Sequence, residues 1–151
     1  TKFQLEASDI DLALVLALGG EKVRGSGRIS GVLPFEIESS KVRLVDGKVH
    51  AEPPGGELHY VSGAKENASN ASLAIALQAL EDFYYDSLDA KLQYTPEGAL
   101  TADIALVGKN PHLFKGRQIN FNVNVEENIP ALIKSIRLAT GAGKDVWSQD
   151  K

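Results

Sequence analysis

Cysteine and methionine are both absent from the 151 residues of this chain. Without cysteine the chain can form no disulfide, no thiolate nucleophile and no thiolate metal ligand, which excludes the enzymes and metal-bound folds that depend on them. The redox compartment stays open, because the absence is compatible with reducing and oxidising compartments alike. Since the chain begins at Thr1 and has no methionine, we expect it to be a segment or processed product of a longer protein.

Basic residues and long apolar runs are also scarce. Sixteen lysines and arginines stand against 20 acidic residues, which gives a formal net charge of -4, and no basic cluster occurs. A nucleic acid or an anionic membrane surface is therefore not an expected partner. The longest apolar run, residues 12–20, is far shorter than the roughly 20 residues that span a bilayer. We expect this segment to be soluble.

The length of the chain favours a single domain with a real hydrophobic core. We expect residues 1–140 to form one β-rich domain. Residues 141–151 have no hydrophobic periodicity and are expected to be a mobile tail.

Most of the chain has the pattern of antiparallel strands. Between residues 20 and 61, short β-branched stretches alternate with turn residues, and Asp46 and Gly47 predict a tight hairpin turn because they tolerate a positive φ. A break at residues 53–56 precedes another strand. A second hairpin is predicted around residues 95–98, and a loop at residues 109–118 leads to an alternating strand over residues 119–125. In this second hairpin we expect four residues of one arm to face four of the other: Leu88, Ala90, Leu92 and Tyr94 against Leu100, Ala102, Ile104 and Leu106.

Two stretches have helical spacing instead. Apolar residues recur at helical intervals over residues 69–82, after several asparagines and serines that could serve as N-cap. A second helix is predicted over residues 128–139, with Asn128 as its N-cap and Pro130 in its first turn. Residues 12–20 are ambiguous, because their leucines alternate as in a strand whereas the flanking aspartate and glycine suit a short helix.

The sequence offers little material for catalysis or metal binding. His50, His59 and His112 have no paired spacing on a helix, so we interpret them as surface or edge residues. The glycines of residues 25–31 follow neither a nucleophile elbow nor a dinucleotide-binding pattern, and we interpret them as permitting close backbone packing or strong curvature in a strand. Glu126 and Glu127 suit the positive end of the second helix better than a metal site. We expect no enzyme activity, no cofactor and no metal.

The predicted strands carry bulky apolar residues on one side and polar residues on the other. In the strand 119–125, for example, Asn120, Asn122 and Asn124 alternate with apolar residues. Such a sheet has to cover its apolar face. Two interpretations stay open: helices and sheet curvature cover the whole face as an ordinary core, or part of it stays open as a trough for an acyl chain or a partner.

Two stretches are similar to those of a known family. Residues 83–139, FYYDSLDAKLQYTPEGALTADIALVGKNPHLFKGRQINFNVNVEENIPALIKSIRLA, resemble the carboxyl-terminal region of the YdbH family, large AsmA-like envelope proteins of Gram-negative bacteria related in architecture to TamB. Residues 25–61 resemble the strand pattern of the same family, with its Gly-rich strand, Leu-Pro step, Asp-Gly hairpin and Pro-Pro-Gly-Gly break. The motif positions of this resemblance are Asn110, Pro111, Gly116, Glu127, Asn128 and Pro130.

The resemblance implies a periplasmic protein anchored in the inner membrane, whose curved sheet encloses an apolar groove that carries phospholipid between the inner and outer membranes. It also implies strand addition by a small outer-membrane lipoprotein, YnbE-like, near the carboxyl-terminal end. An older label of the family, dicarboxylate transport, has no support in these residues, because no basic pocket signature for two carboxylates occurs.

We therefore predict an α+β fold, mostly β, in which two helices cover a curved antiparallel sheet. The predicted role is the terminal module of a phospholipid bridge. The alternative is a non-transporting module that docks its parent protein to an outer-membrane lipoprotein by strand addition. Nine residues are candidates for contact with phospholipid acyl chains and equally for the core: Leu33, Phe35, Ile37, Leu92, Tyr94, Ile104, Leu106, Phe121 and Val123.

Overall fold

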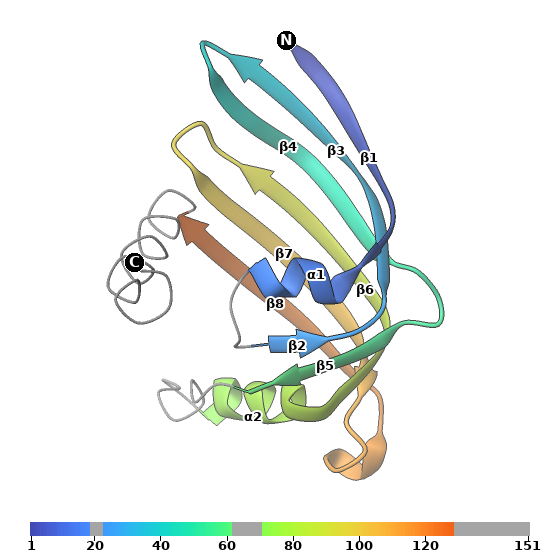
Figure 1. The fold of residues 1–151 in the computed structure, drawn as a ribbon. Coiled ribbons are helices and arrows are strands. Elements are labelled where there is room, and N and C mark those ends of the chain that lie inside the picture. Colours follow the sequence, from blue (N-terminus) through green and yellow to red (C-terminus); the bar gives the residue numbers. More distant parts are fainter. Residues whose placement is uncertain (19–22, 62–70, 129–151) are drawn as a thin grey trace, which may run out of the picture.

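The computed structural model of the chain describes residues 1–18, 23–61 and 71–128. Its main feature is one antiparallel sheet of eight strands, which confirms the predicted α+β, mostly β class (Figure 1). Two α-helices, α1 (Leu12–Leu18) and α2 (Ala71–Ala79), and two 3-10 helices, η2 (Leu80–Asp82) and η3 (Phe114–Gly116), lie between the strands. The strands are β1 (Lys2–Asp11), β2 (Val23–Gly25), β3 (Arg28–Glu38), β4 (Lys41–Ala51), β5 (Gly56–Tyr60), β6 (Phe83–Tyr94), β7 (Ala99–Lys109) and β8 (Ile119–Asn128).

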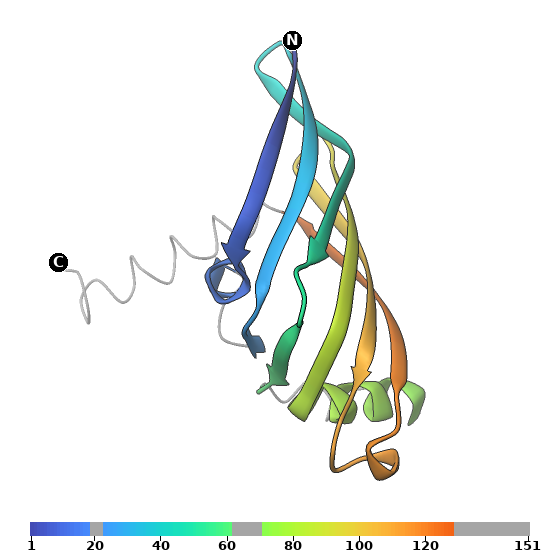
Figure 2. The same cartoon turned by 90° about the vertical axis from the view of Figure 1, so that its right-hand side faces the viewer.

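The sheet is curved and open. β3 lies between β1 and β4, whereas β6 pairs with β4 and β5 on one side and with β7 on the other. β4 and β5 thus pair with successive stretches of the same side of β6. β2 pairs with β5 in the way that β3 pairs with β4. Among the described strands, β1, β2 and β8 each pair with one neighbour, and β1 and β8 form the two long edges (Figures 1 and 2).

Helix α1 lies against one face of the sheet (Figure 2). The side chain of Asp11 accepts a hydrogen bond from the backbone N–H of Ala13 at 3.0 Å and so caps the helix. The N–H of Leu12 donates to the carbonyl oxygen of Gly27 at 2.9 Å, which ties the first turn to the sheet. The ambiguity of residues 12–20 is therefore resolved as a helix over its described part.

The predicted helix over residues 69–82 is confirmed within its described part. α2 runs to Ala79 and continues into η2, and together they lie at the lower end of the sheet in Figure 1. Ala79 is fully buried there. The helix predicted over residues 128–139 lies outside the described residues except for its first residue, as does the tail at residues 141–151.

The predicted hairpin turn at Asp46 and Gly47 is wrong. β4 continues through both residues, and the turn between β3 and β4 is formed by Ser39 and Ser40, with φ of 53° and 66°. Two consecutive positive φ values are typical of the primed turns that join antiparallel strands. Asp46, with φ of 58°, belongs to a β-bulge, because the register of β4 against β3 and β6 shifts between Leu44 and Gly47.

Bulges of the same kind interrupt two further strands. β1 contains one extra residue near Asp9 relative to β3, and β6 contains one, Asp86, relative to β7. Side chains alternate between the two faces of a strand, so one extra residue changes which residues face a given side. In β6 the apolar residues accordingly change from odd positions, such as Tyr85, to even positions, such as Leu88.

The second predicted hairpin is confirmed with its register. Leu88, Ala90, Leu92 and Tyr94 of β6 lie opposite Leu106, Ile104, Ala102 and Leu100 of β7. The predicted loop follows β7 and contains η3.

Residues 126–128, which the sequence assigns to the entry of the second helix, belong to β8, and the rest of that predicted helix lies outside the described residues. Glu126, Glu127 and Asn128 are the last three residues of β8, opposite Thr101, Leu100 and Ala99 of β7. Pairing with an existing strand satisfies their backbone groups along one side. Pro130 lies outside the described residues.

The glycines within residues 25–31 allow neighbouring backbone and side-chain atoms to pack closely against them, as the sequence suggested. A Cβ on Gly31 would overlap the carbonyl oxygen of Lys48, and a Cβ on Gly27, whose φ is 119°, would overlap the hydroxyl of Tyr85. That hydroxyl donates a hydrogen bond to the carbonyl oxygen of Ser26 at 2.7 Å. Gly27 is thus required both by backbone conformation and by contact.

Candidate functional site

One face of the sheet, which we call the apolar face, carries nearly all of the large hydrophobic side chains. Directly paired residues of neighbouring strands share a face. One row across five strands consists of Phe3, Phe35, Leu44, Tyr94 and Leu100, and a second row, nearer α1, contains Val49, Ala90, Ile104 and Val123. The apolar set is therefore continuous from β1 to β8.

The opposite face is polar. Lys48, Asp89, Lys91 and Asp103 line a shallow depression there together with Asn122 and Asn124. The side-chain amide of Asn124 donates a hydrogen bond to the carboxylate of Asp103. Asn122 and Asn124 therefore have the solvent-facing position that the sequence pattern predicted.

A cavity of about 370 Å³ lies on the apolar face beneath α1. From α1 it is lined by Leu12, Val15 and Leu16, and from the sheet by residues of seven strands, β2 to β8, including Ile29 and Val49. All of the lining side chains are apolar apart from the ring of Tyr60, and the exposed lining surface is carbon only. Such a cavity has no group that could orient a polar ligand by hydrogen bonds.

The apolar face is filled at one end. Phe83 and Tyr85 are 0% and 2% exposed, and the ring of Phe121 meets that of Phe83 edge to face, with centroids 5.3 Å apart. Leu58 and Leu106 pack into the same cluster. At this end the interpretation as an ordinary core is correct.

At the other end the apolar face is exposed among the described residues. Phe3 and Leu5 of the edge strand β1 are 45% and 49% exposed, although Phe3 stacks on Phe35 at a centroid distance of 5.2 Å. Ile37 and Val125 are each more than a third exposed as well. Core packing would normally cover side chains of this size, so among the described residues this end offers apolar surface to a ligand or partner.

All nine candidate residues lie on the apolar face, but in three different settings. Leu92, Ile104, Leu106 and Val123 line the cavity, and Leu106 also belongs to the buried core. Phe121 packs against Phe83 at the filled end. Leu33, Phe35, Ile37 and Tyr94 lie towards the exposed end.

The family-motif positions have mainly structural roles where they are described. Asn110 is 3% exposed: its amide donates to the carbonyl oxygen of Ala79 at 3.0 Å, and its side-chain oxygen accepts from the N–H of His112 at 2.8 Å. Pro111 is exposed in the loop that follows, and Gly116 has a φ of 72° in η3. Asn110 thereby joins the end of α2 to the loop after β7.

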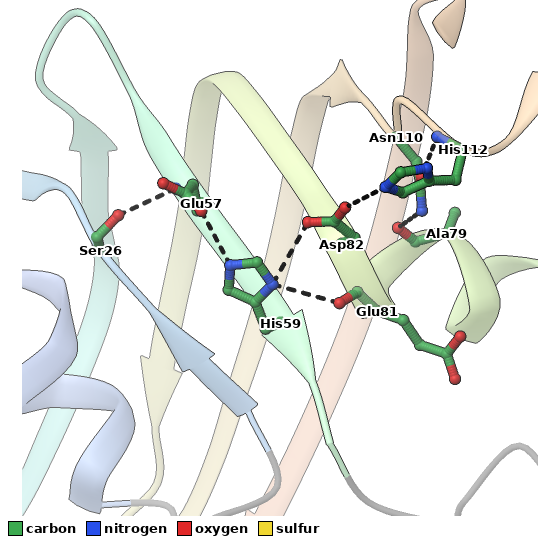
Figure 3. A network of polar contacts seen from close by, with 8 residues as sticks. All are labelled: Ser26, Glu57, His59, Ala79, Glu81, Asp82, Asn110 and His112. Carbon is green, nitrogen blue, oxygen red and sulfur yellow. Dashed lines mark hydrogen bonds and ion pairs between the residues drawn. The ribbon is translucent and has the colours of Figure 1, made fainter. Parts of the chain in front are cut away.

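Two of the three histidines are brought together by one carboxylate (Figure 3). The Asp82 carboxylate lies 3.6 Å from Nδ1 of His59 and 3.2 Å from Nε2 of His112, and Glu57 lies 3.0 Å from Nε2 of His59. The sequence placed these histidines as surface residues, and the side chain of His112 is indeed 78% exposed, but their proximity was not predicted. Neighbouring Tyr84 has its pKa raised, chiefly by the negative charge of Asp82 and then by that of Glu57. The cluster holds η2 against β5 and the loop at Asn110, and the hydroxyl of Ser26 accepts a hydrogen bond from the backbone N–H of Glu57 at 3.2 Å (Figure 3).

Burial raises the pKa of Tyr85, whose hydroxyl lies in the filled end. The unfolded chain therefore loses this proton first as the pH rises above about 10, so stability falls with increasing alkalinity. We expect Tyr85→Phe to flatten this alkaline decline while costing about 1 kcal/mol at neutral pH through loss of the bond to Ser26. Urea denaturation between pH 7 and 11 measures both effects. An unchanged alkaline slope would show that another group is responsible.

The most important lining residues that the sequence did not single out belong to α1. Leu12, Val15 and Leu16 face the cavity because a capped helix, and not a strand, follows β1. The signal was present in the flanking Asp11 and Gly19. Phe83 and Tyr85 were also missed, because Asp86 interrupts the alternation that would have assigned them to the apolar face.

Two kinds of site are absent from the described part of the chain. No cluster of three or more histidine or acidic side chains there could hold a metal ion. No helix within the same residues is long and apolar enough to cross a bilayer.

Comparison with known proteins gives one match. Searches of curated proteins and of solved structures found none. A family model described as "YdbH-like: Intermembrane phospholipid transport protein YdbH" matches residues 1–141, which is nearly the whole chain. With its curved open sheet and continuous apolar face, this chain belongs to the YdbH-like family, a family of intermembrane phospholipid transport proteins.

Proposed function

We propose that the apolar face binds the acyl chains of a phospholipid and that the chain is the terminal module of a periplasmic lipid bridge whose parent protein is anchored in the inner membrane. The observation that supports this most is the entirely apolar exposed lining of the cavity beneath α1, on the same face of the sheet as the exposed side chain of Phe3. Burial of each CH₂ group contributes about 0.8 kcal/mol. A ligand without polar groups along its length gains most from such a surface.

The dimensions of the sheet fit this ligand. β6 has 12 residues, which at a rise of about 3.3 Å per residue gives a strand of roughly 40 Å. One leaflet of a bilayer has a hydrocarbon thickness of about 15 Å, half of the whole core. An extended acyl chain can therefore lie along the apolar face with its polar headgroup outside the cavity, where solvent hydrates it.

Phe35→Asp tests this function on the exposed end. A carboxylate placed beside an acyl chain is desolvated without a partner, so we expect at least a tenfold loss of bound phospholipid. Native mass spectrometry of the chain after incubation with phosphatidylethanolamine vesicles measures the bound lipid. Because Phe35 is only partly buried, thermal unfolding should still be cooperative.

Val32→Asp is the matched control. Val32 lies on the same strand, faces the polar side opposite Lys48 and is 38% exposed. We expect this variant to keep its bound lipid. Equal loss in both variants, or none in either, would argue against an acyl-chain site on the apolar face.

The free edges of the sheet favour a second candidate, a docking module for a small outer-membrane lipoprotein. Among the described strands β8 pairs only with β7, so one side of its backbone is available for strand addition. This candidate needs no lipid. If the purified chain carries no phospholipid in any variant but takes up an extended peptide along β8, the docking module is the better description.

A further inference from the structure

We propose that Leu88 and Leu106 limit the length of the phospholipid acyl chain that the cavity beneath α1 accepts. The terminal methyl group of the acyl chain lies against these two leucines, and the headgroup lies in solvent beyond the exposed end of the apolar face. This inference rests on the proposed function, because it concerns the same cavity and the same ligand. It adds the orientation of the ligand and two residues that determine its length.

The cavity is lined by successive pairs of residues on the two central strands of its floor, β6 and β7. Three directly paired sets line it in turn: Leu88 with Leu106, Ala90 with Ile104, and Leu92 with Ala102. Successive residues on one face of a strand are about 6.6 Å apart, so the first and third pairs are separated by about 13 Å. The cavity therefore has a direction, along the strands.

The two ends of the cavity differ in exposure. At the first pair, Leu88 and Leu106 are 9% and 3% exposed, and both belong to the buried core cluster. At the third pair, Val125 of β8 lies opposite Ala102, lines the cavity and is 37% exposed. The cavity is thus closed at the first pair and open at the third, on the side of the exposed end of the apolar face.

The closed end is packed on its far side. Leu106 lies opposite Phe121, whose ring meets the fully buried ring of Phe83 edge to face. A Cβ on Gly108 would lie 2.9 Å from the ring of Phe83, so this ring is closely packed as well. A close-packed interior accepts an additional methylene group only when side chains shift, which is unfavourable. An acyl chain therefore ends at Leu88 and Leu106.

The distance from the closed end matches the length of a membrane acyl chain. Tyr94 follows Leu88 by six residues on β6, which is roughly 20 Å along the strand. The hydrocarbon thickness of one leaflet, about 15 Å, falls between this distance and the length of the cavity. Extraction from a vesicle exposes every CH₂ group of a chain, and each group that finds no place on the apolar face forgoes about a fourfold gain in affinity. Longer chains are therefore bound less.

Competition among lipids of different chain length tests this limit. The full chain is incubated with vesicles that contain equal amounts of phosphatidylethanolamines with myristoyl, palmitoyl and stearoyl chains, and native mass spectrometry identifies the bound lipid by its mass. Leu106→Ala deepens the closed end, so we expect the bound ratio of stearoyl to myristoyl lipid to rise at least about fivefold. Leu92→Ala is the matched control at the open end. It should weaken the binding of all three lipids and leave their ratio within about twofold.

Ala90→Leu changes the cavity in the opposite direction and removes no core packing. Its larger side chain enters the cavity between the two ends, so we expect the same ratio to fall at least about fivefold. If circular dichroism shows that Leu106→Ala does not fold, Ala90→Leu decides the question. Bound lipid with an unchanged ratio in the folded variants would overturn the length limit and leave the proposed function intact. Absence of bound lipid from every chain, the unchanged one included, would overturn the proposed function and this inference with it.

Discussion

Replacing Phe83 by alanine is expected to lower the free energy of unfolding by about 3–5 kcal/mol, the usual cost for a buried phenylalanine. Phe83 is fully buried, packs edge to face against Phe121 and belongs to the cluster that fills one end of the apolar face. Since single domains are stable by about 5–15 kcal/mol, the loss would remove a large fraction of the total. Urea denaturation followed by circular dichroism measures it.

Phe114→Ala is the matched control, because Phe114 lies in η3 and is 47% exposed. We expect this variant to change stability by less than about 0.5 kcal/mol. If Phe83→Ala were as mild as the control, the filled end would not be the stabilising core of the domain.

The second large effect is expected at Asn110. Asn110→Leu keeps a similar volume but leaves the carbonyl oxygen of Ala79 and the N–H of His112 without their buried partner. Each unsatisfied group costs about 1–3 kcal/mol, so we expect a loss of about 2–4 kcal/mol in the free energy of unfolding. Hydrogen exchange should also show faster opening of α2, because Asn110 links its last turn to the loop after β7.

Asn122→Leu makes the same change on the exposed polar face and should be nearly neutral for stability. A loss at Asn110 no greater than at Asn122 would mean that water replaces the buried amide. In that case Asn110 would be a family-motif position for a reason other than joining α2 to the loop.

The β6–β7 hairpin and the helix at α2 could be predicted because their signals are local. A turn of four residues separates two arms. The apolar residues of each arm alternate without interruption, from Leu88 to Tyr94 and from Leu100 to Leu106, so the register follows from the turn alone. α2 has leucines at helical spacing after a polar stretch. In both cases the residue propensities, the hydrophobic pattern and the turn residues indicate the same structure, and the tertiary contacts agree with it.

The long strands and the cavity could not be predicted, since they depend on pairing between distant residues. Asp46 and Gly47 are favourable turn residues, but β4 has neighbours on both sides, β3 and β6, and their hydrogen bonds keep it extended through the bulge. Ser39 and Ser40 make the turn instead. Likewise, α1 lines the cavity only because the ten-residue strand β1, which precedes it, pairs with β3 and brings Leu12 over the sheet.

The three bulges also constrain how the length of these strands can change in evolution. Each adds one residue to a strand at or beside Asp9, Asp46 or Asp86, and beyond it the apolar side chains change from odd to even positions or the reverse. Deleting the extra residue at a bulge would straighten the strand and leave the apolar side chains on one face, whereas deleting one residue elsewhere in the strand would turn every following side chain to the other face. Away from the bulges, insertions and deletions inside β1, β4 and β6 are thus tolerated in pairs of residues, whereas a bulge can lose its single extra residue without moving the apolar side chains to the other face.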